Sequence, residues 1–155
     1  MLSSVLTKDH GRVDKLLKMF FDSLRSGRPD ELLFKEAEIG LKNHIYWEEN
    51  FLFPAVYKDN KARIAGLEAE HGAIWKMLNE LQDGISKDDL KFLEWKAGGL
   101  LRVLEGHDIN EESYIYKMLD RLTDEQQASL MLREAESSYA PEGWVCKILR
   151  DGSAQ

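Results

Sequence analysis

The sequence predicts an all-α protein, an up-down-up-down four-helix bundle with a short C-terminal helical extension. Three observations support this fold class. Apolar residues recur every three to four positions along long segments rich in Leu, Glu and Lys, which is the period of an amphipathic helix. The chain contains only 3 prolines, so helix breakers are rare. Long helices joined by short connections are typical of a bundle in which neighbouring helices run antiparallel.

The first two predicted helices cover about residues 3–24 and 29–57. The first carries an apolar stripe from Val5 to Phe21 and ends at the turn signal "RSGRP". Pro29 suits the first turn of the second helix, since a residue there has no helical partner for an N–H group. Pro54 is expected to kink or fray the last turn, because proline lacks the N–H that an interior helical residue donates.

The third and fourth predicted helices cover about residues 60–82 and 86–122, separated by Gly84 and by "SKDD", which resembles a helix-capping signature. A shorter helix, about residues 124–137, follows a second capping pattern, "TDEQ". The tail "APEGWVCKILRDGSAQ" is expected to add one docked turn. The predicted organisation is therefore a bundle over residues 1–121 and a C-terminal helix and tail, residues 122–155, packed on it.

Length and composition restrict the class of function. A chain of 155 residues suits one domain, and its formal net charge of −7 disfavours nucleic acid as a partner. Cys146 is the only cysteine, which excludes a disulfide framework and a thiolate zinc cluster and suits a reducing compartment. The first residues, "MLSSVLTKDH", are too polar for a signal peptide, and no apolar run approaches a membrane span. We therefore expect a cytoplasmic protein with no membrane partner.

The 4 histidines are distributed one to each long predicted helix: His10, His44, His71 and His107. His44 lies four residues before Glu48, and His107 lies four before Glu111, so each pair shares one helical face. The neighbours on these faces are mostly apolar, which predicts that the faces point inward. Counting residues from the turns places the first three histidines at similar depth, and the fourth agrees less well.

Two interpretations of this pattern are open. Surface pairs of this spacing are common and contribute only about a few tenths of a kcal/mol. Histidines and glutamates directed at one apolar core would instead cost on the order of several kcal/mol, and a bound metal removes that cost. The pattern favours a metal site with these six ligands: His10, His44, Glu48, His71, His107 and Glu111.

The ligand types narrow the choice of metal. Four imidazoles and two carboxylates without a thiolate suit iron first, with manganese or zinc as alternatives. One tetrahedral zinc ion would use only four ligands, whereas two six-coordinate ions bridged by both carboxylates use all of them and leave room for a small molecule. The ferritin-like di-iron design has Glu-x-x-His pairs, the reverse of the order found here, and is disfavoured.

The stretches "KDHGRV", "HIYWEENFLFPAV" and "EHGAIW", followed by the pair of His107 and Glu111, resemble the hemerythrin family. The resemblance covers about residues 1–120 and is greatest to the bacterial and archaeal hemerythrin-like (HHE cation-binding) members. It implies that Glu48 and Glu111 bridge two irons. It also implies that His10 and His44 bind one iron, and that His71 and His107 bind the other.

Two positions depart from the oxygen-carrying hemerythrins. Trp75 stands where those proteins have a second histidine, and Glu111 followed by Glu112 stands where they have an aspartate. The set of four histidines and two glutamates is similar instead to the hemerythrin-like domain of an iron-sensing F-box protein, and to di-iron proteins that repair iron centres under nitric oxide stress. A simple reversible oxygen carrier is therefore disfavoured.

Several other residues have an ordinary interpretation beside a functional one. Glu49 and Glu112 are interpreted first as solvated surface acids and second as extra oxygen donors. Asp14 is either an exposed acid or a hydrogen-bond partner that orients His10. Core packing is expected for Tyr114 and Trp75, with a redox role as the alternative. Cys146 is expected to be a packed or surface thiol.

The sequence therefore predicts a non-haem di-iron protein that binds or reacts with a small oxidant, namely oxygen, nitric oxide or peroxide, in an iron or nitrosative or oxidative stress response. The alternative is an iron-dependent sensor or interaction module without turnover. A third hypothesis is a metal-free helical bundle that acts through its surface. The first hypothesis includes an enzyme and the other two do not.

Overall fold

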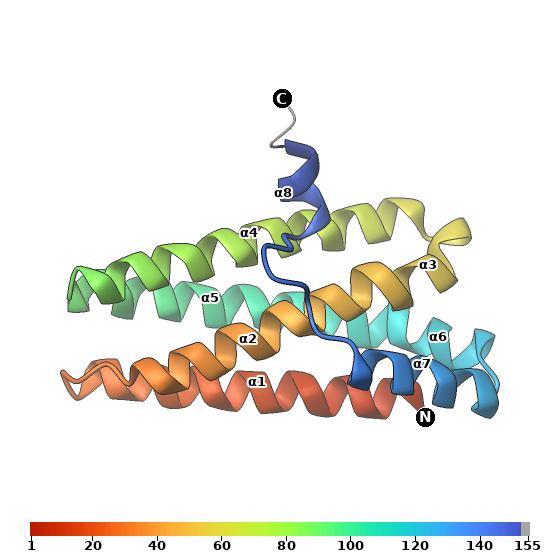
Figure 1. The fold of residues 1–155 in the computed structure, drawn as a ribbon, viewed down its shortest axis with the longest axis horizontal. Helices are drawn as coiled ribbons and strands as arrows, with labels where there is room; N and C mark the ends of the chain where they lie inside the picture. Colours follow the sequence, from red (N-terminus) through yellow and green to blue (C-terminus); the bar gives the residue numbers. More distant parts are fainter. Residues whose placement is uncertain (153–155) are drawn as a thin grey trace.

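The computed structural model describes residues 1–152, so residues 153–155 of the predicted extension lie outside the described range. Within that range every regular element is helical, which confirms the prediction of an all-α protein. Long helical rods lie side by side, and successive rods run in opposite directions (Figure 1). No helix of residues 1–152 has both the length and the apolar composition that crossing a bilayer requires.

The first rod is α1 (Leu2–Arg25), which leads through a short turn to α2 (Glu31–Trp47). The second rod does not end with α2. It continues through a π-helical segment, η1 (Glu48–Leu52), into α3 (Phe53–Val56) and ends in the 3-10 turn η2 (Tyr57–Asp59).

The third rod is α4 (Lys61–Ser86), and the fourth begins with α5 (Leu90–Asn110). A second π-helical segment, η3 (Glu111–Ile115), joins α5 to α6 (Tyr116–Leu122). α1 packs against α2 and α5, and α4 packs against α5 and, less extensively, against α2. Each rod therefore has two neighbours and presents one face to a shared interior.

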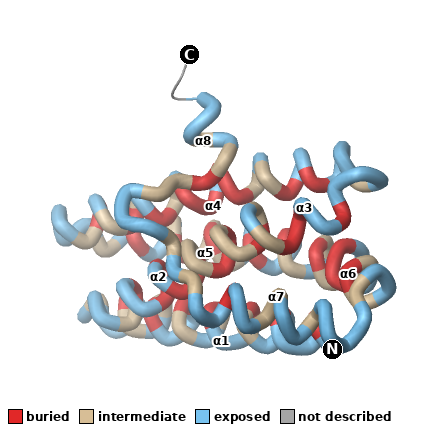
Figure 2. The backbone as a smooth tube through the Cα atoms, turned by 45° about the vertical axis from the view of Figure 1, so that its right-hand side comes forward, coloured by how far each residue is buried: buried red, intermediate tan, exposed pale blue. Residues whose placement is uncertain are grey.

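The buried apolar residues form two clusters, visible as the buried stretches on the inner faces of the rods (Figure 2). The larger cluster includes Phe20, Phe34, Leu78 and Leu100, and the smaller one includes Leu6 and Phe53. In the first, third and fourth rods the histidine lies between the residues of one cluster and those of the other, and in the second rod His44 lies at the end of the larger cluster, next to its last member in that rod, Ile45. The polar site is therefore enclosed by apolar packing at both ends.

Helix boundaries differ from the sequence prediction where side-chain caps decide them. The second helix begins at Glu31 and not at Pro29, because the Asp30 side chain accepts a hydrogen bond from the Leu33 N–H. The third continues to Ser86, and the fourth begins only at Leu90, after the N-cap Asp89. The "SKDD" stretch is therefore the connection itself. Because the turn between the third and fourth rods lies later in the chain than predicted, His71 and His107 lie at similar distances from it along their helices.

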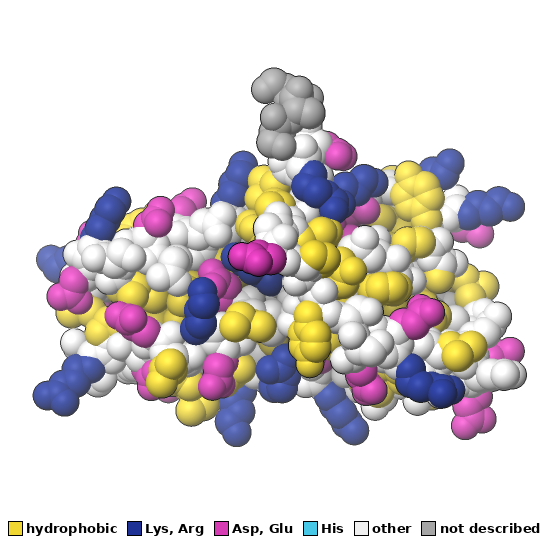
Figure 3. Space-filling view, viewed as in Figure 1, with side chains coloured by type: hydrophobic (Ala, Val, Ile, Leu, Met, Phe, Trp, Pro, Cys, Tyr) yellow, Lys and Arg dark blue, Asp and Glu magenta, His cyan; other side chains and the backbone are white. Residues whose placement is uncertain are grey.

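The C-terminal part crosses the outside of the rods. α7 (Glu125–Ser137) starts with a capping box one residue later than the "TDEQ" pattern indicates, in which Asp124 and Gln127 exchange side-chain to backbone hydrogen bonds, and it packs against α1 and η1. The chain then passes over α2, and α8 (Lys147–Gly152) lies against α4 (Figure 1). On the face seen in Figure 3, acidic and basic side chains are interspersed and no histidine reaches the surface.

Candidate metal centre

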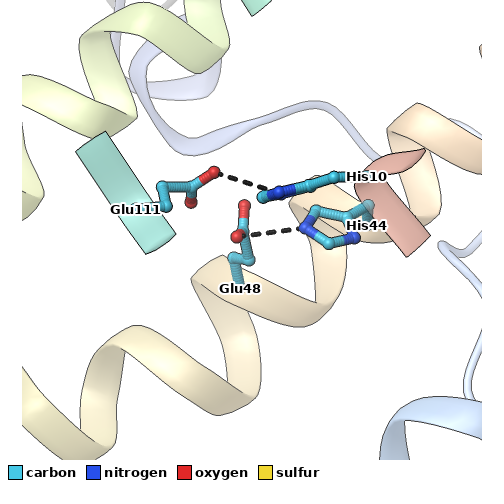
Figure 4. A group of neighbouring side chains, drawn as sticks. All are labelled: His10, His44, Glu48 and Glu111. Carbon is cyan, nitrogen blue, oxygen red and sulfur yellow. Dashed lines mark hydrogen bonds and ion pairs between the residues drawn. The ribbon is translucent and has the colours of Figure 1, made fainter. Parts of the chain in front are cut away.

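The structure brings all six predicted ligands together in the interior, from four different rods. They form two groups that share both glutamates: His10 and His44 with Glu48 and Glu111, and His71 and His107 with the same Glu48 and Glu111. The donor atoms of each group lie within 4.8 Å of one another, and all six residues are buried. Figure 4 shows the first group, with its side chains directed at one another.

Glu48 faces both groups with different oxygens. Its Oε1 lies 3.1 Å from Nε2 of His44, and its Oε2 lies 3.1 Å from Nε2 of His71. This is the placement that a carboxylate needs to bridge two neighbouring ions. The side chain is fully buried, with 0% of its surface exposed, so its charge has no solvent to stabilise it.

Glu111 is the second shared carboxylate. Its Oε1 lies 2.9 Å from Nε2 of His107 and 3.5 Å from Nε2 of His10, but neither of its oxygens has a partner with hydrogen-bond geometry. An unpartnered buried carboxyl group costs on the order of 1–3 kcal/mol or more, and folded proteins rarely retain one. Two buried oxygens without hydrogen-bond geometry, one of them facing two imidazole nitrogens, therefore fit a bound cation.

Each histidine also has its own carboxylate partner at Nδ1, the ring nitrogen opposite the Nε2 atom that faces the shared glutamates. The Nδ1 atoms of His10, His44 and His71 lie 2.9, 2.8 and 2.9 Å from carboxylate oxygens, and Nδ1 of His107 lies 2.5 Å from one. The four partners are, in the same order, Glu112, Asp9, Glu49 and Glu70. A carboxylate on Nδ1 fixes the tautomer that leaves Nε2 available, as is usual for metal-binding histidines.

The site has an internal twofold pattern that the sequence analysis missed. In each half of residues 1–122, an acidic residue and a histidine precede a glycine on one helix, and His-x-x-x-Glu-Glu follows on the next. The acid before the lone histidine orients the histidine of the following helix, and the acid after the shared glutamate orients the lone histidine of the other half. This repeated pattern was the signal that could have identified Asp9 and Glu70.

Both shared glutamates begin a π-helical segment inside a longer helix, Glu48 in η1 and Glu111 in η3. Segments of this kind are rare and occur frequently at functional sites. Pro54 follows η1 closely, but η3 has no proline after it, so proline is not the shared cause. What the two segments share is the Glu-Glu pair, whose first member faces the centre and whose second faces a histidine Nδ1 of another rod.

Tyr116 is a further member of the first group that the sequence did not identify. Its hydroxyl lies 2.9 Å from Nε2 of His10 and of His44, and it donates a hydrogen bond to Oε1 of Glu48 at 2.6 Å. Burial, followed by the charges of Glu111 and Glu48, raises the pKa of Tyr116 well above its usual value. In the second group the matching position holds Phe53, which stacks on His71 with 5.6 Å between ring centroids.

The electrostatics of the centre match a site that exchanges protons for a cation. Burial lowers the pKa of His44, but the charge of Glu48 and hydrogen bonds to Asp9 and Glu48 outweigh it, and the pKa lies well above its usual value. Burial also opposes the upward shift in the pKa of His71, where hydrogen bonds to Glu48 and Glu49 prevail. Without a metal, these imidazoles therefore hold protons that compensate the buried carboxylates.

The two shared carboxylates shift in opposite directions. Burial would raise the pKa of Glu48, but the charge of His44 and hydrogen bonds from Glu111, His44 and His71 lower that pKa well below its usual value. Burial and the charge of Glu48 raise the pKa of Glu111 well above its usual value. Burial likewise raises the pKa of Asp108, which is next to His107, to about 7. One carboxylate is thus ionised and the other protonated, as two close carboxyl groups require.

Several ordinary interpretations need correction. Glu49 is not a solvated surface acid, because its side chain is buried and faces Nδ1 of His71. Glu112 is partly exposed but faces Nδ1 of His10. Asp14 is also partly exposed, but its Oδ2 pairs with Nζ of Lys18 at 2.6 Å, and Glu112 takes the place beside His10.

The three remaining candidates lie in different environments. Tyr114 does not pack in the core, since 52% of its surface is exposed and the Arg63 guanidinium stacks over its ring at 3.7 Å. Trp75 is buried and packs against Trp144 of the C-terminal part, with ring centroids 5.5 Å apart. Cys146 is a buried free thiol in the larger apolar cluster, and it belongs to neither ligand group.

Comparison with protein families agrees with this geometry. The model of the hemerythrin HHE cation binding domain matches residues 1–119, which is most of the chain and includes all six candidate ligands. No curated protein and no solved structure gives a significant match. Together with the buried histidine and glutamate groups, the match indicates a metal-binding site. The chain therefore belongs to the hemerythrin HHE cation-binding domain family.

Proposed function

We propose that the protein is a non-haem di-iron protein that binds or reacts with a small oxidant, namely oxygen, nitric oxide or peroxide. In this proposal, His10 and His44 hold one iron, His71 and His107 hold the other, and Glu48 and Glu111 bridge them. The rods of residues 1–121 correspond to an up-down-up-down four-helix bundle with residues 122–155 as its extension. A role in a cytoplasmic iron or nitrosative or oxidative stress response follows from the same reasoning.

The observation that carries the proposal is that Glu48 and Glu111 belong to both donor groups. A single ion would leave two of the four imidazoles and part of the carboxylate charge uncompensated. Two ions use every donor. The absence of a thiolate from both groups favours iron over zinc, with manganese as an alternative. A reduced iron pair, when bound, supplies electrons and open coordination positions for a small oxidant.

The environments of the two groups differ, which favours ligand binding at the first. Tyr116 and Asp108 lie beside the first group, with Asp108 Oδ1 3.7 Å from Nε2 of His10. Their counterparts in the first half of the chain are Phe53 and Ile45, both buried and apolar. We infer that the oxidant binds beside His10 and His44, where polar groups can donate and accept protons.

A surface cavity of about 520 Å³ between α1 and α5 leads to this group. His10 and Gly11 line it, together with four acids and two basic residues: Asp14, Glu105, Asp108, Glu112, Lys18 and Arg102. Because acids outnumber bases in the lining, the cavity disfavours anions. Oxygen, nitric oxide and hydrogen peroxide are uncharged, so the electrostatics are compatible with all three.

The direct test is to load the metal-free protein with ferrous iron without oxygen, count the bound iron, and record the absorption spectrum after air is admitted. We expect two irons per chain and new near-ultraviolet charge-transfer bands. Binding of no iron, with zinc or manganese also failing to bind, would refute the metal-centre proposal. Two bound irons without any response to oxygen, nitric oxide or peroxide would refute only the oxidant chemistry.

Substituting Gly11 by Leu is expected to slow the reaction of the reduced protein with oxidant several-fold, because the new side chain enters the cavity. A Cβ at Gly11 meets nothing within 4 Å, so the first atom of the new side chain makes no close contact. Stopped-flow absorbance measures the rate. Gly66→Leu is the matched control, since Gly66 is also helical, exposed and free of close neighbours. Equal rates in both variants would exclude the cavity as the route.

Substituting Tyr116 by Phe is expected to leave two irons bound but to remove a visible charge-transfer band of the oxidised protein. The reason is that the Tyr116 hydroxyl contacts three donors of the first group and is itself placed to bind an ion there. Tyr114→Phe, which changes an exposed ring outside the site, is the control. A band that persists in the Tyr116 variant and in the control would show that the phenol is not a ligand.

One observation favours the second candidate function, an iron-dependent sensor without turnover. Glu49, the partner of His71, also accepts a hydrogen bond from the C-terminal part of the chain. Metal occupancy could therefore alter the outer surface. A metal-dependent change in the protease sensitivity of residues 138–152, without consumption of any oxidant, would favour this candidate over the first.

A further inference from the structure

The segment after α7, residues 138–152, lies over α2 and α4, and we call it the strap (Figure 1). Hydrogen bonds attach its first part to α2: Trp47 Nε1 donates to the Ser138 carbonyl at 2.8 Å, and the Ala140 N–H donates to Oδ1 of Asn43 at 3.0 Å. Further along, Trp144 packs edge-on against Tyr46, with ring centroids 5.0 Å apart. The strap is therefore held by specific contacts over most of its length.

The strap occupies the counterpart of the open cavity. The internal twofold pattern relates α1 to α4, α5 to α2, and Gly11 to Gly72, since each glycine follows the lone histidine of its half. Gly11 lines the cavity between α1 and α5, whereas Gly72 is covered by the strap so closely that a Cβ there would lie 2.2 Å from Cγ2 of Ile148. The equivalent opening beside His71 is thus filled by the C-terminal chain.

The strap also reaches the candidate ligands through one carboxylate. The backbone N–H of Lys147 donates to Oε2 of Glu49 at 2.8 Å, and Oε1 of the same carboxylate lies 2.9 Å from Nδ1 of His71. The Glu49 side chain is only 2% exposed, so these two contacts replace water. Its counterpart Glu112 holds His10 in the same way but is 34% exposed and lies at the open cavity.

We propose that the strap is part of the metal centre: it closes the His71 side, and the Lys147 amide positions His71 through Glu49, which makes the two metal positions inequivalent. The inference rests on the proposed di-iron function. The position at His71 and His107 is then rigid and shielded, while the position at His10 and His44 stays accessible. Lys147 acts as a positioning residue through its main chain, independently of its side chain.

A proline at position 147 removes the donor specifically. Lys147 is the first residue of α8, where proline suits the helix, so Lys147→Pro deletes the N–H and keeps the fold of the strap. Loss of an orienting contact of this kind lowers metal affinity on the order of 10- to 100-fold. In anaerobic ferrous titrations we expect one ion to bind as in the wild type and the other to bind more weakly by that factor.

Two controls separate the amide from other effects. Lys147→Ala keeps the N–H and removes only the side chain, whose Nζ lies 3.5 Å from Glu68, and it should leave both binding steps as in the wild type. Glu125→Pro places a proline at the first position of α7, where it touches no ligand contact, and tests for a general effect of proline in the C-terminal part.

A spectroscopic readout distinguishes positioning from mere packing. In the zinc-loaded protein, the Nδ1–H proton of each candidate histidine ligand should give its own NMR signal. The carboxylate that faces each Nδ1 should slow the exchange of that proton with water. In Lys147→Pro we expect the His71 signal to exchange faster on the order of tenfold, with the signals of the other three histidines unchanged. A variant that merely loosened the fold would affect all four.

A second pair of variants displaces the strap without proline. Gly72→Ala should push α8 outward at Ile148 and lower the affinity for the same single ion. Adding Ile148→Ala removes the close atom, since the new methyl group then meets the Cβ of residue 148 at 3.7 Å and Cδ2 of Leu149 at 3.9 Å, which are ordinary contact distances. The double variant should recover the wild-type affinity, which a direct effect on the neighbouring His71 would not.

The outcomes are distinguishable. The proposal is supported if only one ion binds more weakly, the His71 signal is altered, and the double variant recovers the wild-type affinity. Unchanged titrations in Lys147→Pro and Gly72→Ala, or equal weakening of both ions, would overturn it while the di-iron proposal stands. If the wild-type protein binds no metal, the proposed function itself fails. Metal binding by the wild-type protein is therefore measured before any variant is tested.

Discussion

Replacing Glu111 by Leu should abolish the two-metal stoichiometry and also make the metal-free protein more stable. Glu111 belongs to both donor groups, so its loss removes a bridging donor from each position. In the metal-free protein, the Glu111 carboxyl group is fully buried beside the charge of Glu48, and an apolar side chain of similar shape relieves a cost of about 1–3 kcal/mol. Metal analysis and urea unfolding of the metal-free protein measure the two effects.

Glu48→Leu provides the contrast. It should abolish the same stoichiometry but destabilise the metal-free protein by about 3–5 kcal/mol, because it removes the buried carboxylate that faces Nε2 of both His44 and His71 and leaves each imidazole with only the carboxylate at its Nδ1. Glu94→Leu, at an exposed position of α5, is the control for both variants. If the two shared glutamates changed metal-free stability in the same direction, the assignment of one ionised and one protonated carboxyl group would be wrong.

The second large effect is a pH dependence that reverses when metal binds. The pKa values of His44, His71, Glu111 and Asp108 are all raised in the folded, metal-free protein. Such groups bind protons more tightly in the folded state, so their stabilisation is present at low pH and is lost as the pH rises through the folded pKa. Glu48, with a lowered pKa, loses its contribution only in more acidic solution. The free energy of unfolding should therefore fall between about pH 5 and 8.

Metal loading should remove or reverse this slope, because the ions displace the same protons. We expect the apparent affinity for ferrous iron to rise more than about tenfold between pH 6 and 8. Thermal unfolding at a series of pH values, with and without metal, measures both trends. Parallel curves for the two forms would contradict the assignment of these histidines as ligands that must lose protons to bind.

The sequence was most informative where structure is local. Apolar periodicity located the long helices, and the "TDEQ" pattern located the start of α7 to within one residue of its cap at Asp124. The turn at "SKDD" was misplaced because several residues there can cap a helix, and only the hydrogen bond from the Phe92 N–H to Asp89 selects one. The π-helical segments left no recognisable pattern in the sequence.

The six candidate ligands were identified because helical spacing places His44 with Glu48, and His107 with Glu111, on one face. That they bind metal stays a prediction, but the structure brings them together in two groups. The outer carboxylates were missed or interpreted as surface acids, since their partners lie on other rods. No spacing within one helix reports that Glu112 faces His10, or that Glu70 faces His107.

The sequence by itself determined the helical class, the family and the residue types of the candidate centre, because each of these depends on short-range periodicity or on the order of residues along the chain. Only the tertiary structure decided which carboxylate orients which histidine, that Tyr116 joins one group, and that the strap covers the side of His71. These features depend on the depth and rotation of helices relative to one another. Packing of the whole core sets that relationship, and no single segment contains it.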